Sequence, residues 1–393
     1  MNTNENRSGL MNSIAQRAWL VVLVVALLAL LVLGFGQARS TSGADTLEAQ
    51  PAAAIPQQES GHSDYLVSLT RKAMANGFGA ESVMLLAPER GPGREAVAKE
   101  LRGMLTQYRL GRATNGSDFK ETQYDKRILS FVGERSYLEV YTDGTKVRFR
   151  ADLDDPKGAA QTGSHRKLDK EALETLGRRF IGDALRSVVK VGGNESLTFL
   201  GVRYLHQGGG DEYERKKDDR VIANIAVFGR EINGLPVVGS GSKVAVWFTG
   251  DREPAGFDVD WPAYRVLQTS QKVLPQDRLK ARVEAVTRAP KGSSESRVDR
   301  FECGYVDLGA TKRSAQIQPG CSVAFEGRTV TGSGTLQWAR AEFVPAGRRV
   351  MKDPKWPLAN LIATGKEPTA RSMESITLGN GRDPGVDPSK RYK

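Results

Sequence analysis

The chain has 393 residues, of which 57 are Lys or Arg and 46 are Asp or Glu, giving a formal net charge of +11 at pH 7. Basic and acidic residues are mixed and form no long basic block, so the charge does not indicate a nucleic-acid partner. Anionic envelope polymers or lipid headgroups match such a charge better, through general electrostatic attraction. The apolar fraction of 39% is typical of a water-soluble ectodomain of ordinary composition.

Residues 18–36 form an uncharged apolar run, and Arg7 and Arg17 precede it. At 1.5 Å per residue, about 19 helical residues cover the roughly 30 Å hydrocarbon core of a membrane. The preceding arginines favour a cytoplasmic N-terminus and export of the remainder. Gly36-Gln37-Ala38 has the small residues that signal peptidase needs, so a cleaved signal and an uncleaved anchor both stay open. We predict that residues 1–38 target the chain to the cell envelope, with the rest outside the cytoplasm.

Small residues and prolines in residues 39–60 predict a linker, and an N-terminal α+β region follows over residues 61–160. Apolar residues recur at helical spacing in residues 94–108, whereas the hairpin 137–150 alternates as strands do. The turn of this hairpin is Asp143-Gly144, which supplies the positive φ angles that a tight turn requires.

The order of a helix followed by antiparallel strands then recurs. The predicted helices are 168–189 and 279–289, and the predicted strands are 197–205, 221–232, 235–248, 256–261, 298–308, 316–325 and 335–344. We assign residues 161–270 and 271–362 to two further modules, and residues 363–393, rich in Gly, Pro and charge, to a flexible tail. The sequence therefore predicts an α+β chain: an N-terminal transmembrane helix or signal, then tandem modules of a helix packed on an antiparallel β-sheet.

The most distinctive segment is the predicted hairpin 227–248. Asn233-Gly234 forms its turn, and Pro236 needs an edge or non-bonded strand position because it has no N–H to donate. The sequence Gly234-Leu-Pro-Val237 followed by Gly239 resembles the hairpin of PepSY-type modules, which occur in propeptides of thermolysin-like proteases and in bacterial envelope proteins. The resemblance covers about residues 165–265, and the order of elements alone suggests a divergent second copy over 275–345.

This resemblance implies a helix on a small antiparallel sheet that binds or restrains a protein partner without catalysis. Because a strand edge accepts a partner's extended backbone, we place the predicted binding surface on the hairpin. Its candidate residues are Phe228, Ile232, Gly234, Pro236, Val237, Gly239 and Trp247. Core packing is the first interpretation of the aromatic residues near the hairpin, and an exposed groove for a peptide or polymer stays open; these are Phe228, Trp247, Phe248, Trp261 and Tyr264.

Cys303 and Cys321 are the two cysteines of the chain. In an oxidising compartment, a spaced pair within one module predicts a structural disulfide. Closing a loop of about 18 residues contributes roughly 3 kcal/mol in the chain-entropy model.

Residue types that catalyse or bind metals are present, but not in the spacing of a known motif. The histidines, which would need His-Glu-x-x-His to bind zinc on a helix, are His62, His165 and His206. The Gly-Ser-Gly runs, which lack the strand–turn–helix setting of a serine nucleophile, are Gly239-Ser240-Gly241 and Gly332-Ser333-Gly334. The acidic clusters, which lack the ligand order of a calcium loop, are Asp152 with Asp154 and Asp155, and Asp258 with Asp260.

We therefore predict a non-catalytic, membrane-tethered binding or structural protein of the bacterial envelope, without metal or cofactor, that binds an unidentified envelope protein or polymer. Two alternatives stay open. One is an envelope hydrolase acting on peptide or glycan, with carboxylates that only the fold brings together. The other is a spacer subunit of an envelope assembly. Paired buried carboxylates in a cleft would favour the hydrolase, whereas an exposed strand edge or apolar patch would favour binding or assembly.

Overall fold

The computed structural model describes residues 69–76, 78, 82–108, 110, 120–133, 136–151, 165–209, 218–288, 293–331 and 334–369. The predicted N-terminal signal or anchor, the linker and most of the predicted tail lie outside these residues. Within them, no helix is both long enough and apolar enough to cross a membrane.

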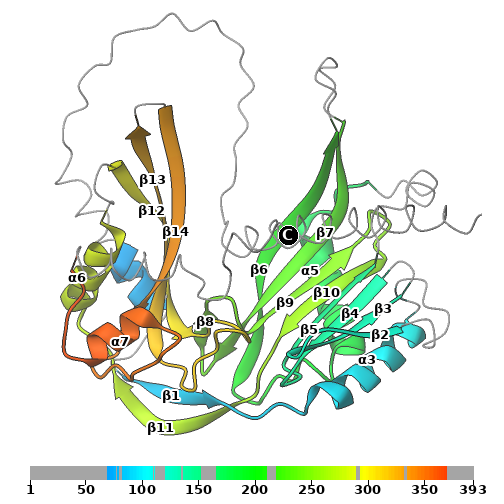
Figure 1. Ribbon diagram of the computed structural model, residues 1–393, viewed down its shortest axis with the longest axis horizontal. Coiled ribbons are helices and arrows are strands. Elements are labelled where there is room, and N and C mark those ends of the chain that lie inside the picture. The colour runs from blue at the N-terminus through cyan, green and yellow to red at the C-terminus, as the bar shows by residue number, and fades with distance from the viewer. Residues whose placement is uncertain are drawn as a thin grey trace, which may run out of the picture.

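The described chain is α+β, as predicted, and most of its strands join one large, mainly antiparallel sheet (Figure 1). The strand order is β14-β13-β12-β8-β7-β9-β10-β5-β4-β3-β2, and β6 pairs with the free side of β7. These strands are β2 Lys120–Asp125, β3 Ile128–Val132, β4 Ser136–Tyr141, β5 Lys146–Ala151, β6 Glu195–Gly209, β7 Asp218–Ile232, β8 Leu235–Val238, β9 Lys243–Phe248, β10 Pro254–Asp260, β12 Ser293–Val306, β13 Pro319–Thr331 and β14 Gly334–Pro345.

One half of this sheet, from β6 and β7 to β2, forms lobe 1. The helices α3 (Arg94–Gln107) and α5 (Lys170–Ala184) pack side by side on one of its faces, with the rings of Tyr108 and Phe180 6.3 Å apart. The helix α3 buries the apolar stripe that its spacing predicts. The helix α5 begins at Asp169, whose side chain accepts a hydrogen bond from the backbone N–H of Ala172.

The other half of the sheet, β12 to β14, forms lobe 2 (left in Figure 1). The helices α6 (Gln276–Thr287) and α7 (Pro357–Ala363) and the helical residues 69–76 contribute to its core. Cys303 and Cys321 lie directly opposite each other in β12 and β13 and form a disulfide, as predicted. The bond lies within the core of lobe 2, where both cysteines are buried.

The lobes do not follow the predicted domain boundaries. The chain leaves lobe 2 through β1 (Ser82–Pro88) and returns through β11 (Tyr264–Lys272), and these two strands pair antiparallel as a separate two-stranded sheet. Residues 89–262 are therefore an insertion within lobe 2. The predicted region 61–160 and module 161–270 share one core in lobe 1. The sequence did not predict this shared core, because local patterns do not show which sheet a strand will join.

Candidate functional site

The turn of the predicted binding hairpin forms as expected, but its strands lie inside the sheet. Asn233 and Gly234 have φ angles of 54° and 76°. The strand β7 is paired with β6 on one side and with β9 and β8 on the other, and β8 is paired in parallel with β12. The expectation that this hairpin offers an open edge is therefore wrong. Pro236 sits in β8, and its neighbours Val237 and Val238 make the pairing with β12.

The hairpin side chains proposed for partner binding are packed inside the protein. Four of them are at most 6% exposed: Phe228, Ile232, Val237 and Trp247. The carbonyl of Pro236 lies so close to Gly304 that any side chain on Gly304 would collide with it. Gly239 has a φ of 105° and lies against the backbone of Asp307. These glycines permit the close approach of β8 and its following loop to β12.

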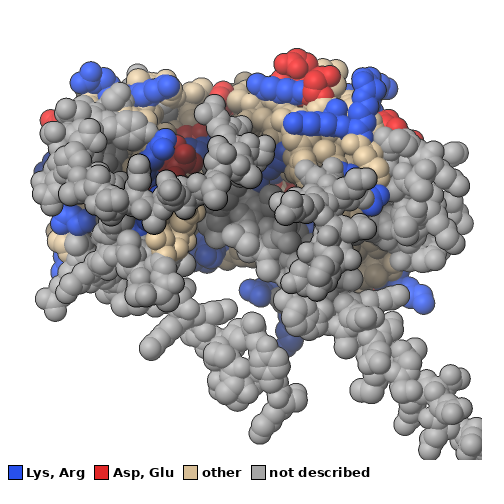
Figure 2. Space-filling view, turned by 90° about the horizontal axis from the view of Figure 1, so that it is seen from above, with Lys and Arg blue, Asp and Glu red and all other residues tan. Residues whose placement is uncertain are grey.

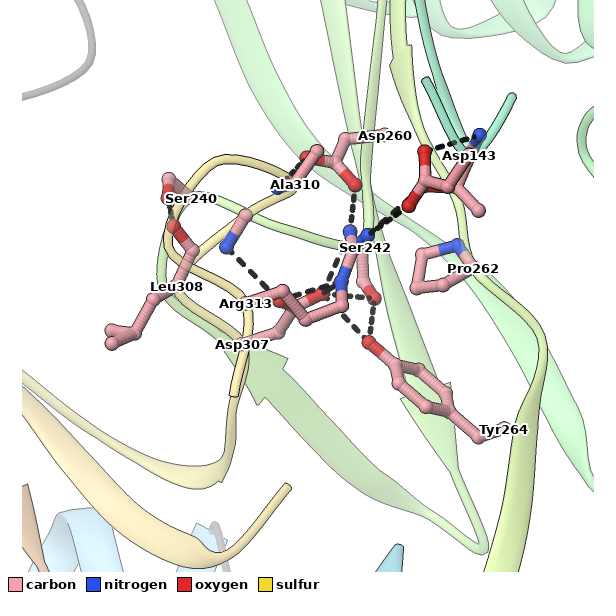
Figure 3. A network of polar contacts seen from close by, with 12 residues as sticks. Asp143, Ser240, Ser242, Asp260, Pro262, Tyr264, Asp307, Leu308, Ala310 and Arg313 are labelled. Atoms are coloured by element: carbon pink, nitrogen blue, oxygen red, sulfur yellow. Dashed lines mark hydrogen bonds and ion pairs between the residues drawn. The ribbon is translucent and has the colours of Figure 1, made fainter. Parts of the chain in front are cut away.

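Asp307, just after β12, is fully buried, and hydrogen-bond donors surround its carboxylate (Figure 3). The hydroxyl of Tyr264 donates to Oδ2 at 2.6 Å, the Ser242 hydroxyl to the same oxygen at 3.2 Å, and the backbone N–H of Gly309 to Oδ1 at 2.9 Å. The backbone N–H of Gly241 donates to the Asp307 carbonyl at 3.0 Å. A Cβ on Gly241 would overlap the carboxylate, so the Gly-Ser-Gly run is required by this contact.

Arg313 of lobe 2 connects this carboxylate to lobe 1. Its Nε donates to Asp307 Oδ1 at 3.2 Å, and its Nη1 donates to the Thr145 hydroxyl at 2.9 Å. Its Nη2 donates to Asp260 at the end of β10, and Asp143 lies 3.7 Å from Nη1. One buried guanidinium therefore ties the loop after β12 to three residues of lobe 1.

The electrostatics of this junction fit a structural role. Burial raises the pKa of Asp260 to about 6, against the opposing charge of Arg313. Burial and then the charge of Asp307 raise the pKa of Tyr264 well above its usual value, so its hydroxyl stays protonated and donates. The fold thus brings together the paired buried carboxylates that a hydrolase would need. Both are engaged by Arg313, however, so the arrangement holds the lobes together.

A second candidate surface is the face of the lobe 1 sheet opposite α3 and α5. Strand register places Arg203, Ile225, Trp247, Gly256 and Arg150 in one row across β6, β7, β9, β10 and β5. A Cβ on Gly256 would meet the side chain of Arg150 at 3.3 Å. With glycine there, the Arg150 guanidinium lies over the Trp247 ring, 3.7 Å from its centroid.

The neighbouring row of this face carries ion pairs. Arg148 Nε donates to Asp258 Oδ1 at 2.9 Å, and Arg148 Nη1 lies 3.6 Å from Glu139. Asp258 also accepts from Arg150. Burial opposes ionisation of Asp258, but the two guanidinium groups outweigh it and lower its pKa. Asp258, noted in the sequence as a calcium candidate, is therefore occupied by arginines.

Two further cations of lobe 1 lie on β9 and β6. Lys243 of β9 donates through Nζ to the carbonyl of Val237 at 2.6 Å, and burial lowers its pKa to about 8. Arg203 of β6 lies within electrostatic range of Arg300 on β12, and burial followed by this like charge lowers the pKa of Arg203. Arg300 is itself 2.6 Å from Glu302.

The strand β6 is an outer strand of lobe 1. Among the described strands it pairs only with β7. Near its start, Arg178 of α5 donates to the carbonyl of Leu197 at 3.0 Å, which shows that this carbonyl points outward. Further along β6, the regular pairing with β7 is interrupted by a register shift at Leu200 and by a φ of 141° at Gly201.

The remaining predicted site residues form no metal centre within the described residues, where no group of three potential ligands is found. His165 lies 3.3 Å from the carbonyl of Val221, and His206 is exposed on β6. His62, the cluster Asp152 to Asp155, and Gly332-Ser333 lie outside the described residues. Figure 2 shows the described Lys and Arg side chains interspersed with Asp and Glu on the face in view.

Sequence reasoning missed Asp307, Arg313, Arg150 and Arg203. Asp307 and Arg313 lie six residues apart, but their other partners come from distant parts of the chain. Arg150 and its partner Asp258 are likewise distant, so no local spacing reveals these contacts. One local signal pointed to the junction: the glycines of Gly239-Ser240-Gly241, considered from the sequence as a serine nucleophile motif, are explained by the close approach of Asp307.

Comparisons with known proteins add little to this geometry. No family model matches the chain, and no curated protein matches it either. Among solved structures, the chain is similar to an uncharacterized protein from Eubacterium rectale ATCC 33656. The identity is 11% and the TM-score 0.44, over 69% of this chain and 87% of that one. A likeness this distant carries no functional argument, and the PepSY-type resemblance stays a prediction.

Proposed function

We propose that this chain is a non-catalytic, membrane-tethered binding protein of the bacterial envelope, and that a protein partner docks on the outer edge of β6. The observation that carries the proposal is the length of this edge: Glu195–Gly209 pairs only with β7 among the described strands. An open edge presents backbone N–H and C=O groups to an extended segment of another chain.

Residues 202–207 are the part of the edge best suited to this role. Upstream, the contact of Arg178 with Leu197 and the irregularity at Gly201 oppose strand addition, as edge-protecting devices do. Within residues 202–207 the register shifts once more, between Leu205 and His206, but the extra residue there, Ile222, lies on β7 and not on β6. We therefore place the binding surface on β6, the strand that pairs with β7, and not on the predicted hairpin itself.

The proposed location rests on two features. The apolar run 18–36 has the length of a membrane-spanning helix, and the buried Cys303–Cys321 disulfide suits an oxidising compartment. Such a tether would place lobe 1 where an envelope protein can reach it. The proposal includes no cofactor, metal or nucleic-acid partner.

Two adjacent proline variants test the edge, because outward and inward N–H groups alternate along a strand. Of His206→Pro and Gln207→Pro, one removes an outward N–H and the other an N–H bonded to β7. We expect the variant that removes the outward N–H to keep the thermal unfolding temperature of wild type and to lose the partner. The variant that removes the N–H bonded to β7 should unfold at a lower temperature.

The readout is amide hydrogen exchange of residues 202–207, measured on the purified ectodomain and on the complex isolated from envelope membranes. Slower exchange in the complex, absent from the first proline variant, is the expected result. Unchanged exchange in the complex would contradict docking at this edge. Cleavage of peptide or glycan by the purified ectodomain, abolished by one Asp or Glu substitution without unfolding, would establish the hydrolase instead.

The spacer alternative also has an observation in its favour. Arg313 and the β8–β12 pairing fix one lobe against the other, as a rigid spacer requires. A spacer contacts neighbours at both ends, so envelope crosslinks on both lobes, with β6 unprotected, would support that function over partner capture.

A further inference from the structure

The helices α3 and α5 leave a groove between the later part of α3 and the end of α5, which we name the helix groove. Its volume is about 450 Å³, within the range of small-molecule sites, about 300 to 1,000 Å³. Met104 and Ala184 line it from the core of lobe 1, and exposed residues of both helices form its sides. The groove is therefore open to solvent on the helical side of lobe 1.

Two glycines inside the helices keep this groove open, Gly103 of α3 and Gly182 of α5. Nothing packs within 4 Å of a Cβ built at either position, and neither glycine has a positive φ. Inside a helix, glycine is less favourable than alanine by about 1 kcal/mol. The fold thus gives no reason for glycine at these two positions, whereas an open groove for a ligand does.

An acid and a base without partners line the helix groove from its two sides. Glu100 lies on α3 and Arg186 just beyond the end of α5, and both are exposed. Neither side chain has an ion-pair or hydrogen-bond partner among the described residues. Asp183, which also lines the groove, is 3.6 Å from Arg179.

The helix ends favour the same division of charge. The last turn of α3 reaches the groove at Gln107 and contains no basic residue, so its carbonyl groups favour a cation. Near the end of α5, Arg186 supplies a positive charge instead. The α3 side of the groove is therefore suited to a cation, and Arg186 to an anion.

We propose that the helix groove binds a short peptide with free termini, its ammonium group at Glu100 and its carboxylate at Arg186. Opposite charges that line one groove without pairing to each other match a zwitterion, because each end of the ligand meets a charge of opposite sign. The glycine positions let the peptide backbone lie close to both helices. This site does not include the edge of β6, so the test below is independent of protein docking there.

Calorimetric titration of the full-length chain with dialanine and trialanine tests the proposal. The two peptides differ in length by about 3.5 Å, so they offer two separations of the terminal charges. The controls are the same peptides acetylated at the N-terminus, without the ammonium group, or amidated at the C-terminus, without the carboxylate. We expect saturable binding of at least one free peptide and about tenfold weaker binding of each capped form. No binding of either free peptide, or equal binding of free and capped forms, would overturn the proposal.

Two charge variants assign the ends of the peptide. Glu100→Gln should weaken binding of the free peptide about tenfold and leave the acetylated form unchanged, because that form has no ammonium group. Arg186→Gln should likewise weaken the free peptide and leave the amidated form unchanged. Glu171→Gln, an exposed acid in the first turn of α5, is the matched control and should change no affinity. Wild-type affinity in both groove variants, or equal effects on free and capped peptides, would overturn the proposal.

A further variant tests the groove itself. Gly103→Leu places a side chain where the ligand would lie, and leucine is a better helix former than glycine. We therefore expect loss of peptide binding with an unchanged or higher thermal unfolding temperature. Wild-type affinity in this variant would overturn the proposal. A lower unfolding temperature would also overturn it, because the glycine would then have a structural reason.

Discussion

A methyl group added at Gly241 would overlap the carboxylate of Asp307. That carboxylate is fully buried and bound by several donors, so it has no room to move away. We expect Gly241→Ala to lower the free energy of unfolding by about 3 kcal/mol, as disruption of a buried charged network does. Urea unfolding at pH 7 measures it.

Gly182 on α5 is the matched control. No atom lies within 4 Å of a Cβ built there, and alanine is more favourable than glycine inside a helix by about 1 kcal/mol. Gly182→Ala should therefore raise the free energy of unfolding. If both alanine variants changed stability by the same amount, the close approach at Gly241 would not be the cause.

Asp260 gives a prediction for pH dependence. Its folded pKa of about 6 lies above the unfolded value of about 3.9. The stability that this group contributes is therefore fully present below pH 4 and is lost as the pH rises through 6. The unfolding free energy of wild type minus that of Asp260→Asn should fall between pH 4 and pH 7, by at most about 3 kcal/mol. Denaturant titrations at four pH values measure it, and a difference that grows with pH would contradict it.

At the scale of elements, the disulfide links β12 to β13 and closes a loop with a sequence separation of 18. The double variant Cys303→Ala/Cys321→Ala should lose about 3 kcal/mol of unfolding free energy. Thermal unfolding of both proteins, with the bond verified by peptide mapping without reductant, measures the loss. Equal stability of the double variant and the oxidised wild type would show that the strand pairing alone is sufficient.

The strand β8 shows why element positions need the tertiary structure. Its four residues pair with β7 in the hairpin and with β12 from the other lobe. The hairpin follows from the local turn at Asn233-Gly234, whose positive φ angles the sequence already indicates. The pairing of β8 with β12 joins residues almost seventy positions apart (Val237 and Tyr305), and no local pattern encodes it.

At the scale of the whole molecule, lobe 1 is an insertion whose ends meet, because Pro88 and Tyr264 are paired neighbours in β1 and β11. Its core is built from residues 97–261. We expect a fragment of residues 89–262 to unfold cooperatively when heated, at a lower temperature than the full ectodomain because the contacts of Arg313 are absent.

A fragment of residues 161–270, the module predicted from sequence, is the control. It lacks β3, β4 and β5, which contribute to the same core, and should show no cooperative transition. Circular dichroism melts of both fragments measure this. A cooperative melt of the shorter fragment would restore the module boundaries that the sequence suggested.

The sequence by itself determined the features that depend on near neighbours. These are the α+β class, the apolar stripe of α3, the hairpin turns at Asp143-Gly144 and Asn233-Gly234, and the pairing of the two cysteines. Each follows from periodicity, from the φ preference of a turn residue, or from there being only two cysteines to pair.

Only the tertiary structure decided how these elements meet. It placed the predicted binding hairpin inside the sheet, merged two predicted modules into one core, and brought Asp260 to the loop that carries Asp307 and Arg313, about fifty residues away in the chain. The physical reason is the same in each case. Strand pairing and buried ion pairs depend on which surfaces become adjacent after the chain collapses, and this adjacency is a property of the whole core rather than of any local segment.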